Sequence, residues 1–125
     1  MALPNAVETP TRVLVGSADS FVAGKPQMIT VGRREIGVYR IGDAFRAILN
    51  FCPHEGIKIC NGRVGGTFVA QEAGEFWRAH EGEVLACPWH GWEFNLLTGV
   101  SLHDPRCRLK SFSTEVHEGM VYVVI

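Results

Sequence analysis

Several features that would set the class of this chain are missing from it. No apolar run approaches the roughly 18–20 residues that a membrane-spanning helix needs, and the first residues show neither the basic nor the apolar region of a secretory signal. The 12 basic and 13 acidic side chains leave a net charge of -1, so no overall field recruits nucleic acid or a membrane surface. The sequence therefore predicts a cytoplasmic protein with no nucleic-acid partner and no membrane partner.

Helical periodicity is also absent, because no stretch keeps a helical spacing of apolar residues over three turns. Fourteen Gly and six Pro in 125 residues instead suit many short strands joined by turns. Strand-like runs, separated by turn residues, cover 12–15, 35–41, 44–49, 108–117 and 120–125. Gly42-Asp43 and Glu118-Gly119 stand between pairs of these runs and predict two hairpins. We expect one all-β domain over residues 1–125.

Two short segments between the predicted hairpins each pair a cysteine with a histidine. The first reads Cys52-Pro53-His54, and the second reads Cys87-Pro88-Trp89-His90 and follows a strand-like run at 83–86. Proline in each segment fixes the backbone and removes an N–H, which stiffens the turn. Two thiolates and two imidazoles form the ligand set of a Rieske 2Fe-2S centre, in which one iron takes both cysteines and the other both histidines. The candidate ligands are Cys52, His54, Cys87 and His90.

Other chemistry stays open for these residues. Cysteines at positions 52, 60, 87 and 107 could form two disulfides in any of three pairings, although a cytoplasmic chain disfavours them. A structural zinc site could use the same two cysteines and two histidines. Zinc fingers usually pair Cys with Cys and His with His, however, and here each segment holds one of each. The arrangement therefore favours the iron-sulfur interpretation.

The two segments resemble the ligand boxes of the Rieske family. The resemblance rests on residues 50–56, Asn-Phe-Cys-Pro-His-Glu-Gly, and on residues 87–92, Cys-Pro-Trp-His-Gly-Trp. It extends to the flanking hairpins and to Leu97-Thr98-Gly99, and so covers the chain from about Arg12 onward. Two boxes in the right order make a far more specific motif than either box alone.

This resemblance implies the Rieske fold, in which antiparallel sheets are stacked and a small subdomain binds the cluster. The cluster-binding subdomain would span about 50–104. Cys52 and Cys87 would ligate the buried iron of one 2Fe-2S cluster, and His54 and His90 would ligate the outer iron. The histidine edges would then face a redox partner.

Departures from the family pattern bear on the reduction potential of the cluster. Quinol-oxidising Rieske proteins are similar but carry an extra Cys in each box, joined by a disulfide, and here Trp89 fills that place in the second box. Those proteins also place Ser and Tyr after the second-box histidine as hydrogen-bond donors to the cluster, where this chain has Trp92 and Phe94. Fewer donors stabilise the reduced cluster less, so we expect a low potential, toward the roughly -150 mV end of the Rieske range.

A long segment separates the two boxes. Thirty-two residues, 55 through 86, lie between His54 and Cys87, more than small Rieske ferredoxins usually have. We expect the excess in an inserted hairpin at about 64–83, with its tip near Gln71–Gly74. Its four glutamates suggest an acidic docking surface for a redox partner, and a solvated loop insertion is the alternative.

The second box also resembles that of ring-hydroxylating oxygenases, whose mononuclear iron domain has no room in this chain. We therefore expect a low-potential Rieske-type ferredoxin without catalytic activity of its own. It would carry one electron from a flavin-dependent reductase to a terminal oxygenase or similar enzyme. The alternatives are the small subunit of a nitrite reductase, a redox-sensing module and a zinc-stapled structural domain. Nitrite reductase small subunits often lack some cluster ligands, and the presence of all four here favours the ferredoxin.

Overall fold

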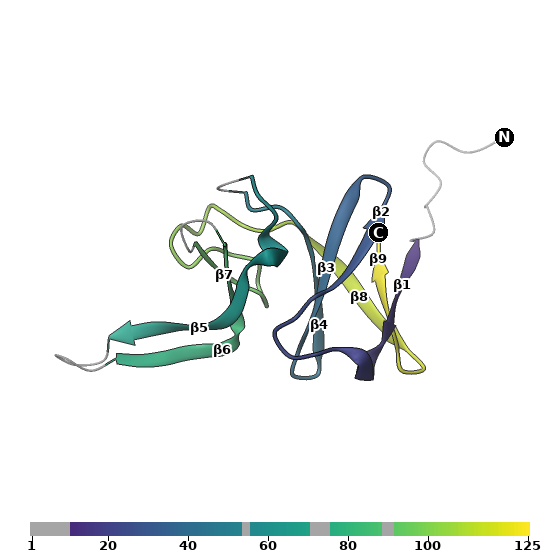
Figure 1. The fold of residues 1–125 in the computed structure, drawn as a ribbon, viewed down its shortest axis with the longest axis horizontal. Helices are drawn as coiled ribbons and strands as arrows, with labels where there is room; N and C mark the ends of the chain where they lie inside the picture. Colours follow the sequence, from purple (N-terminus) through teal and green to yellow (C-terminus); the bar gives the residue numbers. More distant parts are fainter. Residues whose placement is uncertain (1–10, 54–55, 71–75, 89–91) are drawn as a thin grey trace.

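The computed structural model describes residues 11–53, 56–70, 76–88 and 92–125 (Figure 1). The described residues contain no α-helix, only 3-10 turns at Ala18–Ser20 and Ile59–Asn61, and none of their helices is long and apolar enough to cross a bilayer. This confirms the predicted all-β class. The strands are β1 (Arg12–Ser17), β2 (Gln27–Val31), β3 (Arg34–Ile41), β4 (Ala44–Leu49), β5 (Arg63–Ala70), β6 (Phe76–Ala86), β7 (Glu93–Asn95), β8 (Ser111–His117) and β9 (Met120–Val124).

The larger sheet has six strands in the order β1-β9-β8-β4-β3-β2, all antiparallel. Its two three-stranded halves join through only two residue pairs between β4 and β8, Ala47 with Phe112 and Ile48 with Ser111. Buried side chains from both halves pack together into one core, so the sheet closes over itself. These side chains are Ile36, Val38, Phe45, Ala47, Val121 and Val123.

Strand β3 separates this core from a second one. Successive side chains point to opposite faces of a strand, so Ile36 and Val38 enter the first core whereas Tyr39 enters the second. The second core continues into the smaller sheet, of order β5-β6-β7, through the buried side chains of Leu85 and Phe94. The smaller sheet is therefore stacked against the larger one, as the resemblance implied.

Most predicted strands are confirmed, with shifted ends. β4 has the predicted bounds, and Gly42, which has a φ of 60°, makes the tight turn that joins it to β3. β8 begins at Ser111 and not at residue 108, because Leu109 donates its N–H to Gly99 in the neighbouring loop instead of joining the sheet. Two strands, β2 and β7, escaped the prediction. β2 is a short edge strand that pairs only with β3, and β7 has three residues.

Strands β5 and β6 pair antiparallel from Arg63 with Ala86 to Ala70 with Phe76. Figure 1 shows this hairpin extending away from the rest of the fold. The predicted tip near Gln71–Gly74 lies outside the described residues. That 64–83 is an insertion within a cluster-binding subdomain stays a prediction.

Candidate metal centre

Each predicted cysteine ligand lies just beyond the end of a strand. Cys52 follows β4, and Cys87 follows β6 directly. The two side chains are 0% and 2% exposed, and both belong to the second core. All four cysteines lie within the described residues and none of them forms a disulfide, so the disulfide alternative is wrong for this structure. Two buried thiols thus enter one core from two loops.

The two loops close in the same way. The N–H of Cys52 donates to the carbonyl oxygen of Ile57 at 2.8 Å, and the N–H of Cys87 donates to that of Trp92 at 2.7 Å. In the first loop Gly56 also donates to the Cys52 carbonyl at 2.7 Å, with a φ of 71° that favours glycine. In each case a hydrogen bond spanning five residues fixes the cysteine at the start of a compact turn.

The other two predicted ligands, His54 and His90, lie outside the described residues, as does Trp89. Their role as ligands therefore stays a prediction. The described part of the chain contains no group of three metal-binding side chains, since it holds only half of the predicted donor set. By the sequence, each histidine falls inside the turn that its cysteine begins.

A close backbone approach holds the second ligand loop in place. Gly62 has an extended backbone with a φ of -76° and a ψ of -179°, which any residue can adopt. A Cβ at this position would nevertheless overlap the carbonyl oxygen of Ala86, the residue before Cys87. Steric fit, and not backbone conformation, therefore requires glycine here. Sequence analysis missed this contact, because it joins positions far apart in the chain.

A buried thiol that is not a predicted ligand lies nearby in the same core. The Cys60 sulfur occupies the space that a Cβ on Gly37 would need, and the Cys60 N–H donates to Asn50 Oδ1 at 2.8 Å. Burial raises the pKa of Cys60 to about 11. This thiol stays protonated at neutral pH and packs in the core.

The hydroxyl of Tyr39 lies beside Cys60 in this core. Among the described residues it meets no hydrogen-bond partner of standard geometry. Burial, followed by the nearby Cys60 thiol, raises the pKa of Tyr39. The pair is therefore neutral and poorly solvated, and sequence analysis gave no sign of it.

A third loop packs next to the two ligand loops. Ser101 is buried, and its Oγ accepts the N–H of His103 at 3.1 Å. The His103 ring lies 5.7 Å from the Trp92 ring, centroid to centroid, and its Nε2 is 3.5 Å from Glu93 Oε1. Cys107, half-buried on the same loop, packs against the core, and burial is the main cause that raises its pKa. His103 is thus a turn residue next to Trp92 and Glu93, which follow the second box.

Comparison with known proteins points to one family. The model of the Rieske [2Fe-2S] domain family matches residues 11–113. Ferredoxin CarAc of Metapseudomonas resinovorans is 34% identical to this chain over 94 residues, which are 74% of this chain and 73% of that protein. The family-model match includes both ligand boxes.

Solved structures have the same fold. One is a chain from the complex of reduced oxygenase and oxidized ferredoxin in carbazole 1,9a-dioxygenase, with a TM-score of 0.70, 30% identity, and coverage of 90% of this chain and 92% of that one. Another, from Mycobacterium tuberculosis, is named for the small subunit of an NADH-dependent nitrite reductase. It has a TM-score of 0.71, 20% identity, and coverage of 94% and 97%, and so shows the fold alone. The chain belongs to the Rieske [2Fe-2S] domain family.

Proposed function

We propose that this chain is a Rieske-type ferredoxin of the cytoplasm, which carries single electrons from a flavin-dependent reductase to a terminal oxygenase. The observation that carries this proposal is the pair of buried cysteines, Cys52 and Cys87, which form no disulfide and begin two similarly closed loops of one core. It is supported by the likeness to Ferredoxin CarAc and to a chain from an oxygenase–ferredoxin complex, both at 30% identity or more.

The residues present fit one 2Fe-2S cluster. Thiolate is the ligand that iron-sulfur clusters require, and a buried thiolate needs a cationic partner because an isolated buried charge is costly. Cys52 and Cys87 would hold the inner iron, and His54 and His90 the outer iron. When bound, the cluster supplies a one-electron couple. Residues 50–104 would form the cluster-binding subdomain, with an inserted segment at 64–83.

The rest of the chain shields the site and keeps its potential low. Apolar side chains that are at most 1% exposed pack around the cysteines and exclude water, namely Ile59, Leu85, Phe94 and Leu96. Phe94 stands where quinol-oxidising Rieske proteins place a tyrosine donor, and its buried ring offers no hydroxyl. Fewer hydrogen bonds to the cluster sulfurs favour the oxidised state and a low potential.

Metal and sulfide analysis of the purified protein tests this proposal. We expect two iron atoms and two acid-labile sulfides per chain, together with the visible absorption of an iron-sulfur protein. One zinc per chain without sulfide would overturn the proposal and assign the site to a structural zinc ion.

The small subunit of a nitrite reductase is the second candidate, and it rests on fold similarity at 20% identity. The two candidates differ in their partners. A ferredoxin dissociates readily from its oxygenase and therefore purifies without it. A reductase subunit instead copurifies with a large catalytic subunit. Affinity purification of the tagged chain from its native host distinguishes these outcomes.

A further inference from the structure

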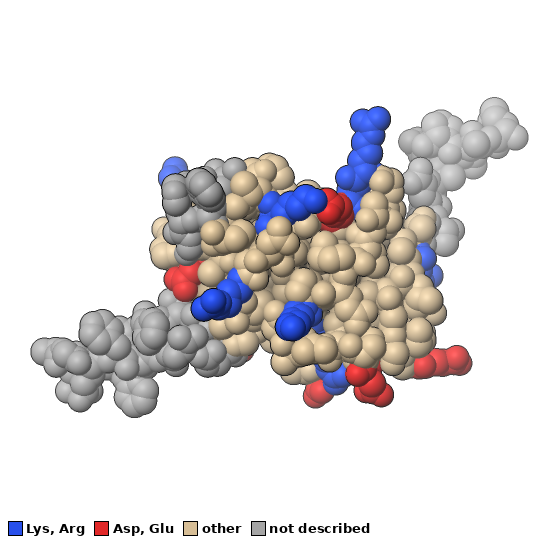
Figure 2. Space-filling view, in the orientation of Figure 1, with Lys and Arg blue, Asp and Glu red and all other residues tan. Residues whose placement is uncertain are grey.

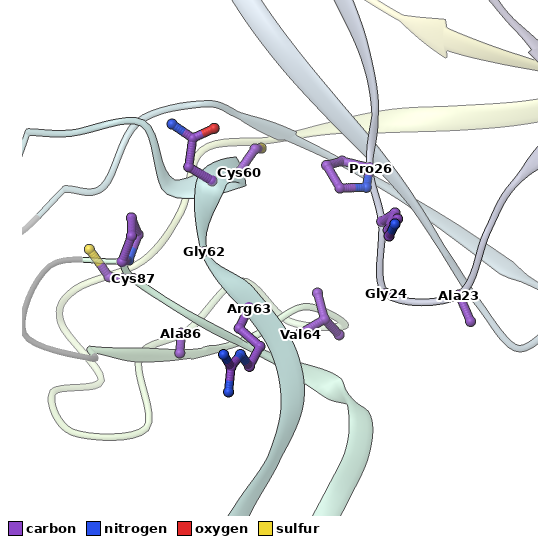
Figure 3. A pocket seen from close by; sticks show the side chains of 12 residues that line it. Ala23, Gly24, Pro26, Cys60, Gly62, Arg63, Val64, Ala86 and Cys87 are labelled. Carbon is purple, nitrogen blue, oxygen red and sulfur yellow. The ribbon is translucent and has the colours of Figure 1, made fainter.

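A groove of about 800 Å³ lies between the larger sheet and the second ligand loop (Figure 3). One wall is the loop that precedes β2, residues 23–26, and the other is formed by residues 60–64 and 86–88. Cys87 and the exposed Pro88 belong to the second wall. A molecule seated in this groove would therefore touch the segment that carries two of the predicted cluster ligands.

The charge of the groove has one sign. Lys25 and Arg63 line it from opposite walls, and no Asp or Glu is among its lining residues. Both basic residues are exposed, and neither forms an ion pair with another described residue, whereas Lys58 is paired with Glu35 at 3.2 Å. On the face shown in Figure 2, basic side chains lie over the junction of the two sheets, and most acidic ones lie along the lower edge.

We propose that this cationic groove anchors an acidic segment of a protein redox partner and holds the partner against the second ligand loop. The proposal rests on the proposed function, since it assigns the groove to an electron-transfer partner. Two unpaired cations flanking a concave surface attract carboxylates, raise the rate of encounter and fix the orientation of the bound protein. The partner's acidic segment would supply the opposite charges that Lys25 and Arg63 do not meet among the described residues.

Electron transfer to a small anion tests the groove without a known partner. Ferricyanide would oxidise the dithionite-reduced protein by one electron and become ferrocyanide. We expect the double variant Lys25→Glu/Arg63→Glu to react about five- to tenfold more slowly at low ionic strength, with the difference shrinking as salt is added. The matched control is Arg33→Glu/Arg34→Glu, which changes the net charge equally at the end of the turn between β2 and β3 and at the first residue of β3.

The control decides between a local and a global effect. A fall of less than twofold in the Arg33→Glu/Arg34→Glu protein supports the groove. Equal falls in the two double variants would mean that only net charge matters, and this would overturn the proposal. With hexaamminecobalt(III), a cationic oxidant, the Lys25→Glu/Arg63→Glu protein (the groove variant) is expected to react faster than the unmodified protein.

A second measurement needs no electron transfer. Hexacyanochromate(III), a redox-inert paramagnetic anion, should broaden the amide NMR signals of Gly24 and Asn61 in the unmodified protein and not in the groove variant. A hexaglutamate peptide should relieve this broadening by competition. Broadening that hexaglutamate does not relieve would mean that the groove binds small anions but no acidic peptide. Broadening only at other residues would mean that the groove binds neither the small anion nor the peptide.

The outcomes separate this proposal from the proposed function. A purified protein without a Rieske electron paramagnetic resonance signal would defeat the ferredoxin assignment, while the chromium measurement would still report on the groove. A normal signal with no response in the groove variant would defeat the groove alone.

Discussion

The backbone N–H of Cys87 donates a hydrogen bond of 2.7 Å to the carbonyl oxygen of Trp92, five residues further along the chain. Cys52 makes the same connection to Ile57 at 2.8 Å. The two candidate ligand loops are therefore closed by their own backbones, and each holds its cysteine buried before any metal is considered. Such preorganised loops on a rigid β scaffold suit a cofactor whose potential depends on fixed surroundings.

Replacing a histidine ligand by cysteine tests the ligand assignment. In His54→Cys, a neutral imidazole gives way to a thiolate, and the added negative charge disfavours reduction. We expect either loss of the cluster or a fall in potential toward the roughly -400 mV of all-cysteine clusters, measured by redox titration. An unchanged potential and spectrum would show that His54 is not a ligand.

Cys60→Ser is the matched control for that variant. Cys60 is buried in the same core but packs against Gly37, so its loss should leave the cluster spectrum intact. Disappearance of the spectrum in this variant would mean that Cys60 is a ligand.

Adding one methyl group at Gly62 should disturb the second ligand loop. A Cβ there overlaps the carbonyl oxygen of Ala86, so we expect Gly62→Ala to cost about 1–3 kcal/mol of stability and to alter the cluster spectrum. Gly42→Ala is the control. Gly42 has a φ of 60°, which disfavours alanine, so this variant should lose about 1–2 kcal/mol of stability at a turn far from the ligand loops. Chemical denaturation and visible absorption measure the two effects. An altered spectrum in Gly42→Ala alone would contradict the account.

Local patterns were enough to predict the two hairpins of the larger sheet. β4 was predicted with its bounds because Gly42-Asp43 marks the turn before it and Leu49 ends its apolar run. In the structure, half-buried and exposed side chains alternate along Gln27–Val31. The sequence nevertheless did not predict β2, because an edge strand of five residues gains its stability from pairing with β3. The strand pairing of a distant segment is not visible in a short window of sequence.

The surroundings of the candidate site depended on contacts between distant segments. Cys60 meets Gly37 across 23 positions of the sequence, and Gly62 meets Ala86 across 24, so no local motif indicates either contact. The cationic groove likewise brings together Lys25, on the loop before β2, and Arg63, at the start of β5. Ligand spacing is a local property, whereas the packing that shields and flanks the ligands is not.

Cys60 should make stability fall in alkaline solution. Its pKa is about 11 in the folded protein and near 9 when exposed, so between these values only the unfolded chain loses the proton. The free energy of unfolding should therefore fall as pH rises, by up to about 1.4 kcal/mol per pH unit. Urea denaturation from pH 8 to 11 should show a shallower fall in Cys60→Ala. Identical slopes would mean that the pKa of Cys60 in the folded protein is not raised above its value in the unfolded chain.

The buried hydroxyl of Tyr39 should be dispensable for stability. Since it has no hydrogen-bond partner of standard geometry among the described residues, Tyr39→Phe should stabilise the fold by about 1 kcal/mol. Tyr122→Phe, at a half-buried position on β9, should change stability by less than about 0.5 kcal/mol. A loss of stability in Tyr39→Phe, measured by urea denaturation, would reveal a real hydrogen bond, with Cys60 as its partner.

An anaerobic redox titration across pH, followed by electron paramagnetic resonance, tests whether this chain is a low-potential Rieske ferredoxin. We expect a one-electron couple near the roughly -150 mV end of the Rieske range, with the signal of a cluster bound by two cysteines and two histidines. A high potential would contradict the ferredoxin role and point to a quinol-linked one. The absence of any iron signal would contradict the cluster itself.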